Sequence, residues 1–153
     1  MNKPNIQALI DSGDATATVI ELDNYLSQLC EYGERLENLS APQKVFYLNQ
    51  NLEREVNNGG FHQYFFNSSG DHADGTVPAL EAIGALKTAE LLREAIGKFP
   101  DGKVLKDQDQ RQVLMVDALP ISIFGELDEK FFAYEDPLTD LNFEWIRKNA
   151  GEF

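Results

Sequence analysis

The sequence predicts an all-α protein, a compact single-domain multi-helix bundle of about seven to eight helices. In most segments apolar residues recur at steps of three and four, the spacing that places them on one face of a helix. Helix caps and turns that contain glycine or proline separate these segments. No series of alternating strands occurs. The 153 residues, 42% of them hydrophobic, are enough to bury one core, so we expect one domain over residues 1–153.

The first predicted helix spans residues 19–37. Its apolar face is made by Val19, Leu22, Leu26, Leu29 and Leu36. We expect three glutamates to lie on the solvated side or its flank, rising along the helix axis by about 4.5 Å per step. They are Glu31, Glu34 and Glu37.

The second helix should begin at a capping box formed by Ser40 and Gln43, with Pro42 in the first turn. Its inward residues are Val45, Leu48, Leu52 and Val56. It should end within residues 57–60, because Gly59 and Gly60 favour a tight helix–helix corner with positive φ or a close backbone approach.

Residues 61–66 are strongly aromatic, with Phe61, Tyr64 and Phe65 at helical spacing. A strand is the alternative for such a run, but its brevity and lack of a pairing partner favour a helix. We expect these rings to face mostly inward. Exposed instead, they would form an interaction surface.

Five further elements precede the last helix. They are helices near residues 76–86 and 88–99, a turn at residues 100–102, and helices over residues 108–118 and 121–135. The helix at 108–118 is the least regular, because Val113 to Val116 are apolar without a break. After Asp136 and Pro137, a stripe of apolar residues predicts the last helix. The stripe is Leu138, Leu141, Trp145 and Ile146.

The charge is large and uneven. Twenty-six acidic and thirteen basic residues give a net charge of −13, which disfavours binding to nucleic acid or to anionic membranes. Residues 1–40 carry −5, residues 41–106 carry −1 and residues 107–153 carry −7. A single cysteine, no apolar signal core near the N-terminus and no long apolar run predict a cytoplasmic protein.

Few residues suggest catalysis or metal binding. Cys30 is expected to be a buried, unreactive thiol, and His72 with Asp71 and Asp74 is better explained as a solvated loop than as a cation site. Glu55 and His62 are a conceivable carboxylate–imidazole pair. A simpler interpretation is that Glu55 caps the helix after Gly60, because this role needs no second side chain. We therefore expect no catalytic residue, no metal and no cofactor.

The run Glu55 to Asn67, followed by Ala79 to Ala85, resembles the signature of a bacterial domain family. That family is named after a neisserial DNA-mimic protein. The resemblance covers residues 45–97 most specifically, and it implies an all-helical fold, an acidic surface and, for the namesake, a dimer. It also implies that the shared motif is scaffold: Glu55, Gly59, Gly60, Phe61, Gln63, Tyr64, Phe65, Asn67 and Gly84. Because acidic surface residues differ between members, mimicry has to depend on the chain's own charges.

These charges lead to the functional hypothesis of an acidic protein that occupies the DNA-binding surface of a transcription factor or other DNA-binding protein. The expected contact residues are the carboxylates Glu31, Glu34, Glu37, Asp128, Glu129, Glu135, Asp136, Asp140 and Glu144. Such a protein would bind neither nucleic acid nor a membrane directly, and it could form a homodimer. One alternative is an immunity- or antitoxin-type module that binds one cognate protein. A third is an enzyme centred on Glu55 and His62.

Overall fold

The computed structural model describes residues 1–153, and the all-α prediction is confirmed: the chain forms eight α-helices and no strand. The helices are α1 (Ile6–Ser12), α2 (Ala15–Leu29), α3 (Ala41–Phe66), α4 (Ala73–Ala82), α5 (Leu86–Ile96), α6 (Gln108–Ala118), α7 (Gly125–Phe132) and α8 (Leu138–Lys148). Short 3₁₀ segments join them: η1 (Glu31–Gly33), η2 (Leu36–Asn38), η3 (Ser68–His72), η4 (Pro100–Gly102), η5 (Ile121–Phe124) and η6 (Ala150–Glu152).

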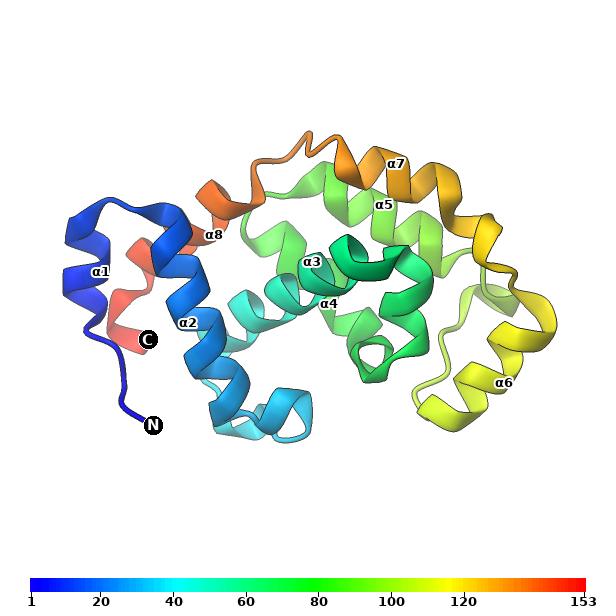
Figure 1. Ribbon diagram of the computed structural model, residues 1–153, viewed down its shortest axis with the longest axis horizontal. Helices are drawn as coiled ribbons and strands as arrows, with labels where there is room; N and C mark the ends of the chain where they lie inside the picture. The colour runs from blue at the N-terminus through cyan, green and yellow to red at the C-terminus, as the bar shows by residue number, and fades with distance from the viewer.

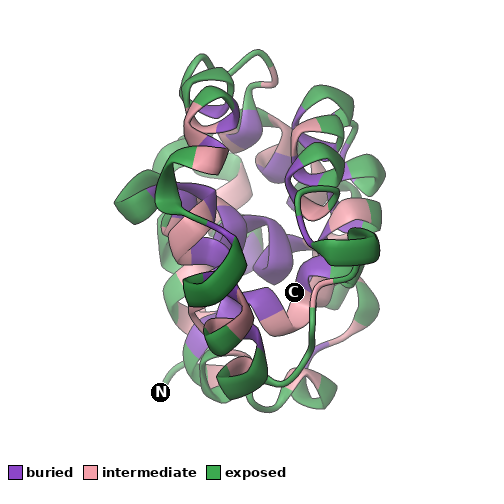
Figure 2. Cartoon of the chain, turned by 90° about the vertical axis from the view of Figure 1, so that its right-hand side faces the viewer, coloured by how far each residue is buried: buried purple, intermediate pink, exposed green.

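Helix α3 runs through the middle of the molecule, and the other helices pack around it (Figure 1). Helices α1, α2 and α8 lie at one end, α4, α5 and α7 cover the other half of α3, and α6 lies at the far end. Figure 2 shows the buried residues on the inner sides of the helices, with exposed residues outside. No helix is long and apolar enough to span a membrane.

The start of α3 is set locally, as predicted. The Ser40 hydroxyl accepts a hydrogen bond from the Gln43 backbone N–H, and the Gln43 side chain accepts one from the Ser40 N–H. Together they form a capping box, which satisfies two backbone donors that the first turn leaves free. The capping box is thus confirmed.

The predicted corner at Gly59 and Gly60 is also confirmed, as a break inside α3. Gly60 has φ 73°, and a Cβ atom there would lie 2.5 Å from Asp128 Oδ2. The Phe61 N–H donates to Asp128 Oδ1 at 2.8 Å, so a carboxylate from α7 caps the second half of α3. Only glycine allows both the backbone angle and this approach.

The aromatic run after the break is helical and mostly buried, as expected. Phe61, Tyr64 and Phe65 are fully buried, and the Tyr64 hydroxyl donates to Thr76 Oγ1 at 3.0 Å. Phe65 packs edge-on against Phe99, with their ring centroids 4.9 Å apart. The run is therefore part of the core and not an exposed aromatic patch.

The predicted helix over residues 19–37 is wrong at both ends. Helix α2 begins at Ala15, capped by Asp14, and it ends at Leu29. Glu31 and Tyr32 then take left-handed backbone angles, with φ 50° and 57°, and Gly33 follows with φ 97°. The Asn38 side chain donates to the Leu29 carbonyl at 3.0 Å, which satisfies an acceptor at the helix end.

Other differences concern helix boundaries. Helix α1 was not predicted, because only Ile6 of its residues is buried and the apolar pattern is too short to detect. The predicted helix over 121–135 is divided into η5 and the shorter α7. The predicted helices near 76–86, 88–99 and 108–118 correspond to α4, α5 and α6.

Candidate functional site

One acidic stretch of the chain spans α6 and the start of α7. Residues 107–129 contain six acids and one base, Arg111. The Arg111 side chain is fully buried, so it contributes no cation to the surface. Four of the acids are exposed there and were not among the predicted contact residues: Asp107, Asp109, Asp117 and Glu126. A sequence signal was present, because no base occurs between Arg111 and Lys130.

Arg111 holds α6 in place. Its guanidinium donates to the carbonyls of Phe65 and Asn67, at the end of α3, and to those of Leu105 and Lys106, which precede α6. It also forms an ion pair with Asp71 at 2.8 Å. A buried guanidinium is tolerated because five partners replace its water shell. The only base of this segment therefore stabilises the fold and is not available on the surface.

The acidic face of α6 has an apolar centre. Val113 is 62% exposed and Val116 is 75% exposed, and with Phe66 they line a shallow hollow of about 460 Å³. Asp109 and Asp117 also line it. Exposed apolar side chains surrounded by charge are typical of a protein-binding surface.

The three N-terminal glutamates do not form the predicted row on one helix. Glu31 lies in η1, Glu34 follows that segment, and Glu37 lies in η2. All three are exposed, but Glu37 forms an ion pair with Arg35. The argument that these carboxylates follow the charge spacing of DNA along a helix is therefore wrong, because α2 ends before them.

The predicted C-terminal carboxylates divide into two groups. Asp128 caps the second half of α3, and Asp136 accepts from the Thr88 N–H at 2.7 Å and from its hydroxyl at 2.9 Å. Glu135 and Glu144 form ion pairs with Lys87 and Arg147. The remaining two carboxylates are exposed and form no ion pair. They are Glu129 and Asp140.

The predicted acidic groups from the two chain ends do not merge into one face. Helices α2 and α8 pack together, as expected if the chain ends meet. However, the segment that follows α2 and helix α7 lie on opposite edges of the molecule (Figure 1).

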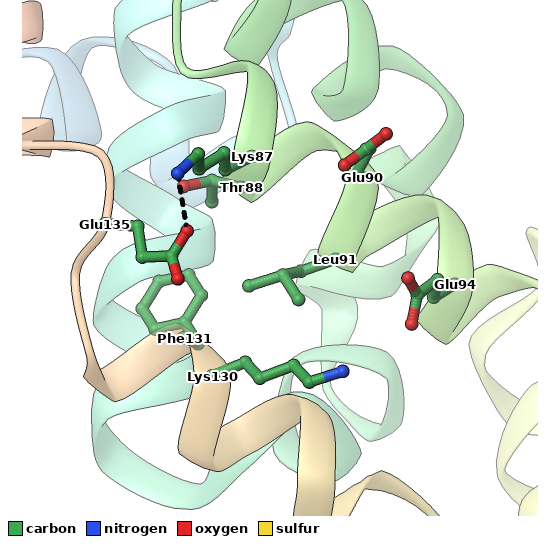
Figure 3. A pocket seen from close by; sticks show the side chains of 8 residues that line it. All are labelled: Lys87, Thr88, Glu90, Leu91, Glu94, Lys130, Phe131 and Glu135. Carbon is green, nitrogen blue, oxygen red and sulfur yellow. Dashed lines mark ion pairs between the residues drawn. The ribbon is translucent and has the colours of Figure 1, made fainter.

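A hollow of about 280 Å³ between α5 and α7 has mixed charge (Figure 3). Leu91 and Phe131 supply its apolar part. The surrounding polar side chains include both signs: Lys87, Glu90, Glu94, Lys130 and Glu135. Lys87 and Glu135 are joined across it at 2.9 Å. Because two lysines border it, this part of the surface resembles DNA less than the α6 face does.

The shared motif surrounds the glycine break. Glu55 Oε2 accepts hydrogen bonds from the side-chain amides of Gln63 at 3.1 Å and Asn67 at 2.8 Å, and so it links the two halves of α3. Gly84 has φ 82° at the turn between α4 and α5. These contacts lie within the chain's own helices and contain no exposed acidic row.

The conceivable Glu55–His62 pair does not form, because the Glu55 carboxylate contacts amides instead. Nor does Glu55 cap the helix after Gly60, since Asp128 does so. His62 stacks on Phe66 with a centroid distance of 5.5 Å, and burial lowers its pKa. The carboxyl group of Asp128 has a raised pKa, mainly because of desolvation.

Cys30 is fully buried, and burial raises the pKa of its thiol. The thiol is therefore held in its protonated, weakly nucleophilic form. No group of three or more His, Cys, Asp or Glu side chains is arranged to hold a metal ion.

Residues 37–149, most of the chain, match the family described as DMP19-like protein. No curated protein and no solved structure shows a significant match. The matched region begins in η2, so it includes the glycine break, the buried Arg111 and the whole acidic face of α6. On this match, the chain belongs to the DMP19-like protein family.

Proposed function

We propose that this chain binds the DNA-contacting surface of a DNA-binding protein, such as a transcription factor, and keeps DNA from it. The observation that carries the proposal is the acidic stretch of α6 and the start of α7, where Asp109, Asp117 and Glu126 are exposed and the one base is buried. Membership of a DNA-mimic family supports the same function.

The physical basis is the competition for cations. A DNA-binding protein gains much of its affinity from Lys and Arg side chains that contact phosphates. Carboxylates that have no cation of their own are free to pair with those side chains. Val113 and Val116 add apolar area at the centre of the face, which a DNA duplex does not offer. This centre would let the partner distinguish the protein from DNA.

The predicted contact set changes accordingly. Asp128 and Asp136 are assigned to the fold, because a partner would have to compete with the backbone N–H groups that they accept from. Glu31, Glu34, Glu129 and Asp140 remain exposed and unpaired, so they stay predictions for the rim of the contact. Homodimer formation stays a prediction as well.

The test begins with capture of proteins from a native lysate on the immobilised chain at low salt, followed by elution with salt. A captured protein is then purified and mixed with duplex DNA and with the chain. We expect the chain and the duplex to exclude each other. A stable ternary complex of all three would contradict the proposal.

A triple variant locates the contact. Asp109→Lys, Asp117→Lys and Glu126→Lys together should weaken binding at least about tenfold, because three attractions become repulsions. The matched control is Asp11→Lys, Glu21→Lys and Glu152→Lys. It makes the same change in net charge at the α1–α2 end, far from α6 (Figure 1). Equal losses in the two variants would show that only total charge matters.

A further inference from the structure

A polar groove lies between η1 and the junction of α3 with η3. It has two arms of about 330 Å³ and 210 Å³, which share four lining residues. The shared residues are Tyr32, Asn51, Ser68 and Ser69. Gln108 at the start of α6 lines the larger arm, so the groove opens beside the acidic face.

The groove carries uncompensated negative charge. Glu55 lines the larger arm, and only its Oε2 accepts hydrogen bonds from the protein. Glu34 lines the smaller arm and forms no ion pair. The cations nearby are already engaged: Arg54 with Asp23, and Arg111 with Asp71. A cationic ligand would therefore meet the free Oε1 of Glu55 and the unpaired carboxylate of Glu34. Arg54 also lines the larger arm, but its charge is paired with Asp23.

Asn51 supplies a free hydrogen-bond donor to the groove. It is 8% exposed and lines both arms. Its Oδ1 accepts a hydrogen bond from Arg54 at 3.1 Å, whereas its Nδ2 donates to no protein atom. The Nδ2 atom is not sealed in the interior, so its N–H groups are free to donate to a ligand in the groove.

An exposed aromatic ring lies at the mouth. Tyr32 lines both arms and is 70% exposed. Its left-handed backbone is held by its neighbours: the Cys30 carbonyl accepts from Gly33 and Arg35, and His72 Nε2 donates to the Gly33 carbonyl at 3.2 Å. The ring is thus positioned by the fold, although the protein itself covers little of it.

We propose that this groove binds an arginine residue of a partner polypeptide. The guanidinium lies against the Tyr32 ring and donates to the free oxygen of Glu55, and a backbone carbonyl of the partner accepts from Asn51 Nδ2. Arginine fits better than lysine, because a planar guanidinium both stacks on an aromatic face and donates to a carboxylate. The inference rests on the proposed function only for the source of that arginine, a basic DNA-contacting surface.

The probe is N-acetyl-arginine N-methylamide, titrated into the full ¹⁵N-labelled chain and followed by NMR. We expect saturable shifts confined to the backbone of Tyr32 and Gly33 and to the side-chain amide of Asn51. Two matched probes serve as controls. The lysine analogue should bind several-fold more weakly, and the uncharged citrulline analogue should cause no comparable shifts.

Two variants test the contacts. Glu55→Gln keeps an acceptor oxygen for Gln63 and Asn67 but removes the charge, and it should weaken the arginine probe about tenfold. Tyr32→Ala changes an exposed side chain and should weaken the probe about threefold. If Glu55→Gln does not fold, Tyr32→Ala and the citrulline comparison decide the matter.

Absence of saturable shifts at the groove, or equal binding of the citrulline probe, would overturn the inference. Equal binding of the lysine probe would overturn the assignment to arginine. These outcomes are separate from the test of the proposed function. Arginine binding together with a ternary complex of chain, partner and DNA supports the groove and overturns the mimicry.

Discussion

Two neighbouring acidic stretches of the chain differ in what their carboxylates contact. In residues 128–144, Asp128 and Asp136 accept hydrogen bonds from backbone N–H groups, and Glu135 and Glu144 form ion pairs. In residues 107–126, three exposed carboxylates accept no hydrogen bond from the protein: Asp109, Asp117 and Glu126. The base within that second stretch, Arg111, lies in the interior.

The difference shows that charge counted along the sequence does not measure the charge offered to a partner. A carboxylate that caps a helix is already neutralised in part, and a partner would have to break its hydrogen bonds. A carboxylate without a protein contact can pair with a partner's cation without first losing hydrogen bonds to its own chain. Four predictions test whether the two stretches differ in this way.

The largest effect is expected for Arg111→Met, which should lower the free energy of unfolding by about 3–5 kcal/mol. The variant leaves four carbonyls and the Asp71 carboxylate without their donor. Chemical denaturation measures the loss. The control, Arg93→Met, breaks the half-exposed pair with Glu81 and should cost less than about 1 kcal/mol. Equal losses would mean that Arg111 does not anchor α6.

Asp128→Ala should cost about 2 kcal/mol, because the Phe61 N–H loses its acceptor in a partly buried position. The neighbouring Glu129→Ala removes an exposed carboxylate and should be nearly neutral. Asp128→Asn keeps an acceptor oxygen and should fall between the two. Denaturation midpoints compare all three. If Asp128→Ala does not change the free energy of unfolding, Asp128 is not needed for the fold and again counts as a free carboxylate.

Asp136→Ala should cost about 1 kcal/mol through the loss of two hydrogen bonds at the start of α5. Hydrogen exchange should show faster opening of the first turn of that helix. Asp140→Ala is the matched control, because Asp140 is exposed and forms no ion pair. If the two variants behave alike, the distinction between fold-bound and free carboxylates fails for this stretch.

The smallest effect concerns pH. Burial lowers the pKa of His62, so between that lowered pKa and about 6.5 the unfolded chain binds more protons than the folded one. Stability from this group is complete above about pH 6.5 and is lost as the pH falls through the lowered pKa. The raised pKa of Asp128 acts in the opposite sense in a more acidic range, where its contribution is lost as the pH rises.

His62→Gln should therefore flatten the dependence of the denaturation midpoint on pH between about 5.5 and 7.5, the range that the histidine controls. An unchanged slope in the variant would show that His62 is not the group responsible. Asp128→Asn in the same series removes the acidic contribution, and because the Asp128 charge raises the pKa of His62, it should also move the histidine transition to lower pH.

Much of the fold could be predicted from local patterns. The capping box at Ser40, the break at Gly60 and the buried aromatic run each depend on residues close in sequence. The end of α2 could not be predicted this way. Leu36 continues the apolar spacing of α2, yet it packs against the core from η2 after the chain has turned at Tyr32.

The candidate site was predicted less well, for the same reason. Sequence places acids near each other along the chain, but the partners of Asp128 and Asp136 are 67 and 48 residues away. The burial of Arg111 depends on carbonyls from the end of α3. Such contacts cannot be recognised from the spacing of residues along the sequence, because they form only when distant helices pack together.

The sequence alone determined the helical class, the main turns, the motif shared with the family and the excess of acid near the chain's ends. These follow from periodicity, capping chemistry and composition, which act over a few residues. Tertiary structure alone decided which carboxylates are free. Packing buried the one base of α6 and placed the carboxylates of Asp128 and Asp136 against backbone N–H groups of other helices. The carboxylates that remain exposed on α6 and at the start of α7 are therefore the ones that we propose as contacts.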